Sequence, residues 1–314
     1  MFPFLKLAVK LCTKMCDVST YYANIDPITT PIETIAELIS NHNVISYTPG
    51  CWEAIKEIDE DPDNVNNVVL IYSRRSEPKS TSGLSTGWNR EHVWPRSYGV
   101  GDNGPDYSDL HHLFPSDVQV NAARSSKILG ECTASNCVSP AHSEAASDTS
   151  SNSYIFTPPI SVKGDLARAL MYMALRYDGT DANTENLTMS ECPCRYTFTS
   201  PGKLSTLLEW HEQDPVDDAE RARTDRVCSY QGNRNPFVDM PSLADRIYGD
   251  VSIPSSCPFC QEAAQDGDDT TESPSNSDDD GGTLMMKYGA ICGGVIVVLI
   301  ALVISYWVCC RTKK

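Results

Sequence analysis

Two short polar segments of this chain carry the kinds of side chain that phosphodiester hydrolysis needs. They are Asn89-Arg90-Glu91-His92-Val93-Trp94-Pro95-Arg96 and, further along, Asn121-Ala122-Ala123-Arg124. An imidazole with a pKa near neutrality can take a proton from water. A carboxylate and an amide oxygen together suit a hard cation such as Mg²⁺ or Ca²⁺, and arginine can bind a phosphate through paired hydrogen bonds. The two segments therefore predict metal-assisted hydrolysis of a phosphodiester.

Further segments, from about Tyr21 to Asp250, resemble a known family in the order in which they occur. They are Tyr21-Tyr22, Val44-Ile45-Ser46-Tyr47, Trp52, Asp59-Glu60-Asp61-Pro62, Asp109-Leu110-His111-His112-Leu113, Lys163-Gly164-Asp165-Leu166-Ala167-Arg168-Ala169 and Gln231-Gly232-Asn233-Arg234-Asn235-Pro236-Phe237. Together with the two polar segments they resemble the bacterial endonuclease I family of non-specific nucleases. The resemblance implies an α+β fold class: a mainly helical domain built around a ββα-metal core, also called a His-Me finger.

The resemblance also implies a role for each residue of the predicted site. His92 would be the general base, and Glu91 and Asn121 would hold the catalytic metal, which is Mg²⁺ by first choice, with Ca²⁺ or Mn²⁺ as alternatives. The loop between the histidine and the asparagine is shorter here than in some family members. It lacks an arginine that those members use on the scissile phosphate. Arg96 or Arg124 would have to replace that arginine, and for both an ordinary salt bridge is the competing interpretation.

Two strands and a helix must place these side chains. Apolar and β-branched patterns predict strands over residues 68–72, 88–94 and near 109–114. Ser116-Asp117-Val118-Gln119 predicts a capping box, and therefore a helix that carries Asn121 and Arg124 on neighbouring positions. Adjacent residues of a strand point to opposite faces. Glu91 and His92 can therefore share a site only at a strand end or a bulge.

Helical spacing of apolar residues predicts most of the remaining core. Helices are expected over residues 31–41, 52–58, 204–211 and 217–230, with an exposed loop over 132–153. A further helix should begin at Asp165 as its N-cap, with one inward face that includes Leu166, Leu170 and Tyr177. Asp109, His111 and His112 could ligate a metal, but support of the strand behind the site is the favoured interpretation.

The net charge of −17 argues against strong electrostatic binding to a DNA duplex. Residues 261–280 carry eight acidic side chains and no Lys or Arg, whereas seven basic and six acidic side chains lie between Arg74 and Lys127. A local basic cleft at the site is therefore compatible with the composition.

An uncharged apolar run over residues 288–308 would span about 31 Å as a helix, enough to cross a bilayer. Arg311, Lys313 and Lys314 follow it, which predicts a cytosolic tail over 309–314 and a single-pass type I membrane protein. A GPI signal is the weaker alternative. The other predicted segments are a weak signal-peptide-like stretch over 1–17, a catalytic domain over 18–260 and an acidic disordered stalk over 261–287. The catalytic domain would be extracellular or lumenal.

Cysteines are predicted to form disulfides in an oxidising compartment. Without Cys12 and Cys16 near the start and those near the membrane run, eight remain, an even number: Cys51, Cys132, Cys137, Cys192, Cys194, Cys228, Cys257 and Cys260. Zinc is the second possibility for Cys257 and Cys260. Asn186-Leu187-Thr188 is a glycosylation sequon that fits a lumenal domain.

The sequence thus predicts a monomeric, metal-dependent, non-specific endonuclease that acts on DNA and RNA. It would contact the phosphate backbone without base specificity and leave 5′-phosphate ends. Two alternatives remain open at this point: a binding ectodomain that has kept the nuclease fold without turnover, and a phosphodiesterase for small molecules.

Overall fold

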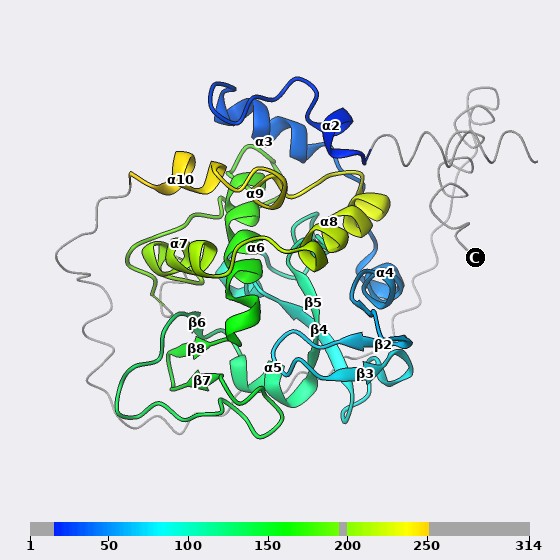
Figure 1. Ribbon diagram of the computed structural model, residues 1–314, viewed down its shortest axis with the longest axis vertical. Helices are drawn as coiled ribbons and strands as arrows, with labels where there is room; N and C mark the ends of the chain where they lie inside the picture. Colours follow the sequence, from blue (N-terminus) through cyan, green and yellow to red (C-terminus); the bar gives the residue numbers. More distant parts are fainter. Residues whose placement is uncertain (1–15, 195–199, 251–314) are drawn as a thin grey trace, which may run out of the picture. The chain divides into compact units, whose positions relative to one another are not determined.

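The strand–strand–helix unit that carries the predicted site is formed by β4 (Trp88–His92), β5 (Leu113–Asp117) and α5 (Val118–Arg124). This computed structural model describes residues 16–194 and 200–250. β4 and β5 are antiparallel with an unbroken register from Trp88↔Asp117 to His92↔Leu113. α5 begins directly after β5 and packs against both strands (Figure 1).

The boundaries of this unit differ in three places from the sequence-based expectation. The first strand, expected over residues 88–94, ends at His92. The helix is capped by Asp117, not by Ser116, because the Asp117 carboxylate accepts hydrogen bonds from the backbone N–H groups of Gln119 and Val120. The second strand begins at Leu113 instead of near Asp109. Residues 106–112 form turns, since the Asp109 side chain and nearby backbone groups bind partners outside the sheet.

Two further small sheets flank this unit. β1 (Glu60–Asp61), β2 (Asn64–Val69) and β3 (Ser76–Pro78) form an antiparallel meander, and β6 (Ile128–Leu129), β8 (Ile155–Thr157) and β7 (Ser150–Ser151) pair in that order. The strand expected over residues 68–72 was placed too late, because β2 ends at Val69. Leu70, Ile71 and Tyr72 are buried in the core without strand pairing. An apolar run predicts that its residues are buried, but it does not predict that they pair with another strand.

Helices build the rest of the core around α6 (Lys163–Arg176), which lies in the middle of the helical part (Figure 1). Against α6 pack α3 (Ile32–Ser40), α7 (Leu204–Gln213) and α9 (Pro236–Asp239). The other helical elements are α2 (Val18–Tyr21), η1 (Tyr47–Cys51), α4 (Trp52–Ile58), η2 (Lys79–Thr81), η3 (Arg96–Tyr98), η4 (Ile160–Val162), α8 (Asp218–Gln231) and α10 (Leu243–Tyr248).

α6 is more deeply buried than its predicted single inward face. Every residue from Leu166 to Arg176 is buried. Asp165 was wrong as the N-cap, because the helix begins earlier, after Val162, and has no side-chain cap. Asp165 instead forms an ion pair at 3.2 Å with Arg168, which is also paired with Glu220 of α8 at 2.7 Å. These ion pairs compensate the charge of the Arg168 guanidinium, which is buried in the core.

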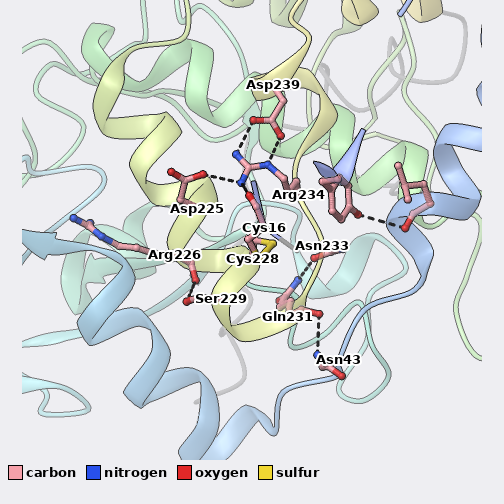
Figure 2. The surroundings of a disulfide bond; sticks show 12 residues. Cys16, Asn43, Asp225, Arg226, Cys228, Ser229, Gln231, Asn233, Arg234 and Asp239 are labelled. Carbon is pink, nitrogen blue, oxygen red and sulfur yellow. Dashed lines mark hydrogen bonds and ion pairs between the residues drawn. A yellow bond between two sulfur atoms is a disulfide. The ribbon is translucent and has the colours of Figure 1, made fainter. Parts of the chain in front are cut away.

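A disulfide between Cys16 and Cys228 ties the start of the described chain to α8. Figure 2 shows Arg234 beside it, where the guanidinium donates to the Cys16 carbonyl at 2.6 Å and pairs with Asp225 and Asp239. Leaving Cys16 out of the disulfide set was therefore wrong. Cys51 is a free, buried thiol, which corrects its inclusion. Cys132 and Cys137 form a second disulfide. Cys192 and Cys194 each take part in a disulfide bond as well.

The double variant Cys16→Ser/Cys228→Ser should lower the free energy of unfolding by about 2–5 kcal/mol, because this link spans 212 positions of sequence and restricts the unfolded chain strongly. Urea unfolding followed by circular dichroism would measure it. The matched control is Cys132→Ser/Cys137→Ser, whose bridge spans only 5 positions and should cost less. An equal loss in both double variants would contradict the loop-length argument.

Among residues 16–194 and 200–250, no helix combines the length and apolar character needed to cross a bilayer. The predicted transmembrane segment over 288–308, the stalk over 261–287, the tail over 309–314, Cys257 and Cys260 all lie outside the described residues. The same holds for most of the signal-peptide-like stretch over 1–17.

Candidate active site

His92 is the last residue of β4, and its ring lies among aromatic side chains. Its Nε2 atom lies 2.9 Å from the carbonyl oxygen of Tyr107. A carbonyl only accepts, so Nε2 must carry the proton and Nδ1 must carry the lone pair. Burial, followed by the effect of His112, holds the pKa of His92 well below its usual value of 6.5. The ring is therefore neutral near pH 7, with Nδ1 as a proton acceptor.

Glu91 points to the opposite face of β4, as strand alternation requires. One of its carboxylate oxygens, Oε1, accepts a hydrogen bond from the Tyr72 hydroxyl at 2.7 Å and lies 3.3 Å from Nε of Arg124. Burial raises the pKa of Glu91, while Arg124 and the hydrogen bond from Tyr72 oppose that rise. Both contacts are made to Oε1, so Oε2 is the oxygen through which Glu91 could reach a cation.

β4 has no bulge at this point, but it ends at His92. A strand end is one of the two arrangements that would allow Glu91 and His92 to serve one site.

Asn121 lies on the same side of β4 as Glu91. Its side-chain nitrogen donates to Oδ1 of Asn89 at 2.7 Å and to the carbonyl oxygen of Arg90 at 3.4 Å. Asn89 and Glu91 are two residues apart on a strand and therefore share a face. These hydrogen bonds fix the amide orientation, so Oδ1 is the atom through which Asn121 could contact a cation.

The donor set fits a hard divalent cation. It offers one carboxylate oxygen and one amide oxygen, and Mg²⁺ commonly binds proteins through one or two such groups with water and phosphate oxygens completing its shell. Across the described residues, no three or more His, Cys, Asp or Glu side chains converge as they do at a zinc site. Glu91 and Asn121 would be the residues that hold the ion.

Arg124 is buried, with 1% of its side chain exposed. Its guanidinium donates to the backbone oxygens of His92 at 3.3 Å, Val93 at 2.6 Å and Ser125 at 3.1 Å. It thus connects the Glu91 carboxylate to the end of β4. This environment gives Arg124 the position of a support for Glu91, away from solvent.

Replacing Arg124 by methionine should lower the free energy of unfolding by about 3–5 kcal/mol, because the Glu91 carboxylate would remain buried without its cation. Thermal unfolding of the two proteins measures the difference. Arg96→Met is the matched control, since the Arg96 side chain is 45% exposed and its removal should change stability little. If both variants were as stable as the parent, the Glu91–Arg124 pair would have no structural role.

Arg96, in η3, is the more accessible of the two predicted phosphate contacts. It forms an exposed ion pair with Asp102, and its guanidinium carbon lies 5.5 Å from the ring centroid of Tyr107. Exposed pairs of this kind contribute little, so a phosphate can replace Asp102 at low cost.

Asp109 and Gln231 form a supporting network that sequence reasoning did not assemble. Asp109 accepts hydrogen bonds from the hydroxyls of Tyr172 and Tyr177, both at 2.8 Å, and from Gln231 Nε2 at 3.0 Å. Gln231 in turn accepts from the backbone N–H of Leu110. Burial acts to raise the pKa of Asp109, but neighbouring histidines and the His111 N–H outweigh it and keep the carboxyl ionised. The network holds the turn whose Tyr107 carbonyl orients His92.

The contacts of Asp109 favour the interpretation that Asp109, His111 and His112 support the strand over the interpretation that they ligate a metal. All three are buried, and His112 Nε2 contacts the Asp106 carbonyl at 2.8 Å. The segments that contain Asp109 and Gln231 could both be recognised in the sequence. Their contact was not, because Asp109 and Gln231 are far apart along the chain.

Comparison with known proteins places this arrangement in a family. The family model for Endonuclease I matches residues 32–242. An extracellular ribonuclease of Bacillus subtilis (strain 168) is 40% identical over 237 residues, covering 74% of this chain and 79% of that protein. An extracellular ribonuclease of Bacillus amyloliquefaciens is 42% identical over 241 residues, covering 75% and 80%. The match spans β4, β5 and α5 together with the helices that support them, and this chain belongs to the endonuclease I family.

Proposed function

We propose that this chain is a metal-dependent endonuclease that hydrolyses phosphodiester bonds of DNA and RNA and leaves 5′-phosphate ends. The observation that carries the proposal is the fixed tautomer of His92, with Nε2–H on the Tyr107 carbonyl and Nδ1 as the free acceptor. Membership of the endonuclease I family supports a nuclease, and relatives named extracellular ribonucleases support RNA as a substrate.

His92 acts as the general base in this mechanism. Nδ1 takes a proton from the attacking water, whose oxygen bonds to phosphorus while the bond to the 3′-oxygen breaks. The leaving 3′-oxygen takes a proton from solvent, which gives a 3′-hydroxyl and a 5′-phosphate. The Tyr107 carbonyl stabilises the imidazolium that forms, because it accepts a hydrogen bond from Nε2–H in both charge states.

Glu91 and Asn121 hold the divalent cation, with Mg²⁺ as the first choice. When bound, the cation would offset negative charge on the phosphate and on the leaving oxygen. Arg124 keeps the Glu91 carboxylate in place, and Arg96 contacts the phosphate from its exposed position. All of these groups act on the backbone of the nucleic acid, so cleavage is non-specific with respect to bases.

An extracellular or lumenal location belongs to the same proposal. The disulfides Cys16–Cys228 and Cys132–Cys137 support an oxidising compartment, and the names of the relatives support secretion. Asn186 is exposed, as glycosylation at its sequon requires. Anchoring through residues 288–308 and the monomeric state remain proposals from sequence.

The test of function is cleavage by the purified full chain. Plasmid DNA and single-stranded RNA should both be degraded in Mg²⁺, and EDTA should stop cleavage because the oxygen donor set depends on the cation. Restored cleavage on adding back Mg²⁺ is the control for damage by EDTA. Cleavage of a chromogenic diester alone would favour the small-molecule phosphodiesterase. Binding without any turnover would favour the inactive ectodomain.

A further inference from the structure

Two tyrosine rings lie next to His92, and an arginine lies against each of them, so that Arg90, Tyr47, Tyr107 and Arg96 form a row. Tyr47 itself is stacked on His92 with ring centroids 5.6 Å apart. The guanidinium carbon of Arg90 lies 3.5 Å from the ring centroid of Tyr47, and the Tyr47 ring lies 4.1 Å from that of Tyr107. The Tyr107 ring is stacked on His92 with centroids 5.1 Å apart, and Arg96 stands 5.5 Å from it. Tyr47 and Tyr107 are both only half-buried.

The Arg90 end of this row is fixed and the Arg96 end is loose. Arg90 donates to the Tyr47 carbonyl at 2.5 Å and also lies 4.1 Å from the ring of Trp52. Arg96 lies farther from its ring and is 45% exposed. It is held by an ion pair with Asp102, which is itself 69% exposed, and by a long hydrogen bond of 3.4 Å to the carbonyl oxygen of Gly101. A ligand can therefore displace Arg96 from Tyr107 without disturbing Tyr47 or Arg90.

We propose that Tyr107 and Arg96 form a binding site for one unpaired base of the nucleic acid, beside the phosphate that His92 attacks. The base stacks on Tyr107, and the Arg96 guanidinium covers it. A guanidinium can lie flat on a base while its N–H groups, which lie in the same plane, reach a phosphate oxygen. This inference rests on the proposed nuclease function and names its preferred substrate as single-stranded nucleic acid.

An unpaired strand fits these contacts better than a duplex. A duplex base is covered on both faces by its neighbours and must leave the stack before it can lie on Tyr107. Electrostatic attraction alone should bind nucleic acid weakly. The chain carries a net charge of −17, and Arg90 and Arg96 are the cations in this row. Stacking on an aromatic ring supplies affinity that does not depend on charge or on base identity. The fixed Tyr47–Arg90 support lowers the cost of ordering Tyr107.

Binding in EDTA tests the inference separately from cleavage. A fluorescein-labelled single-stranded oligonucleotide and a hairpin duplex of the same sequence are titrated with the full chain, followed by fluorescence anisotropy. Tyr107→Leu should weaken binding of the single strand about tenfold and change duplex binding less than about twofold, whereas Tyr107→Phe should bind both as the parent does. The inference is overturned if Tyr107→Leu binds the single strand normally, or if it loses both ligands equally.

A second measurement uses the unaltered protein, in case Tyr107→Leu does not fold. A single-stranded oligonucleotide with one abasic position is digested in Mg²⁺, and the products are resolved by length. Cleavage should fall about tenfold at the phosphate beside the abasic position. Uniform cleavage through that position would overturn the inference while leaving the nuclease function standing. Absence of cleavage of any DNA or RNA would instead overturn the nuclease function.

Discussion

Replacing His92 by alanine should lower the rate of DNA and RNA cleavage by about 10²–10⁴-fold, because the reaction loses the group that takes the proton from water. Affinity for nucleic acid, measured by anisotropy in EDTA, should remain near that of the parent. Extra Mg²⁺ should not restore turnover, since the predicted ligands Glu91 and Asn121 are still present. Added imidazole should restore part of the rate by entering the space beside Tyr107.

His142→Ala is the matched control for this change. It removes the same side chain from a loop residue whose Nδ1 accepts from the backbone N–H of Glu144, well outside the β4–β5–α5 unit. Its cleavage rate should equal that of the parent. Near-normal cleavage by a folded His92→Ala protein would remove the general base from the mechanism. Recovery of that variant at high Mg²⁺ would make His92 a ligand instead.

The dependence of cleavage on pH follows from the same residue. A general base works in its neutral form, so the rate falls as the pH drops through the pKa of the base in the folded protein. Burial and His112 hold the pKa of His92 well below 6.5. The rate in saturating Mg²⁺ should therefore remain high at pH 6.5 and decline only in more acidic buffer. A decline centred at or above pH 6.5 would show that the folded protein does not depress the pKa of His92.

The elements of the site could be predicted because they are short and local. The strand around Glu91 and His92 and the helix that carries Asn121 follow from spacing within a few residues, whereas the end of β4 at His92, two residues before the predicted end, does not. The resemblance to endonuclease I supplied the order in which they assemble, and the family match agrees with it.

Contacts between distant segments could not be predicted. Cys16 looked like part of a leader, yet it is bonded to Cys228. Arg124 was a predicted phosphate contact or an ordinary salt bridge, yet it is buried and paired with Glu91. Helix periodicity gives the direction of a side chain and does not reveal which residues surround it. The Tyr172 and Tyr177 hydroxyls that hold Asp109 lie in and directly after α6, where the sequence pattern indicated only an apolar core. Polar networks of this kind depend on three-dimensional neighbours.

Replacing Glu91 by glutamine should act on both the metal and the fold. The amide is neutral, so affinity for Mg²⁺ should fall and the cleavage rate at limiting Mg²⁺ should drop by at least about tenfold. Arg124 would remain buried without its counter-charge, which should lower the free energy of unfolding by about 3–5 kcal/mol.

The double variant Glu91→Gln/Arg124→Met separates these two roles. It removes both buried charges, so its stability should exceed that of Glu91→Gln, because no uncompensated guanidinium remains in the core. Its Mg²⁺ dependence should stay as poor as that of Glu91→Gln, since the carboxylate is still missing. Thermal unfolding and Mg²⁺ titrations of cleavage measure the two properties on the same samples. Full activity of either variant at low Mg²⁺ would exclude Glu91 as a ligand, whereas recovery of metal affinity together with stability would show that Glu91 acts only through the fold.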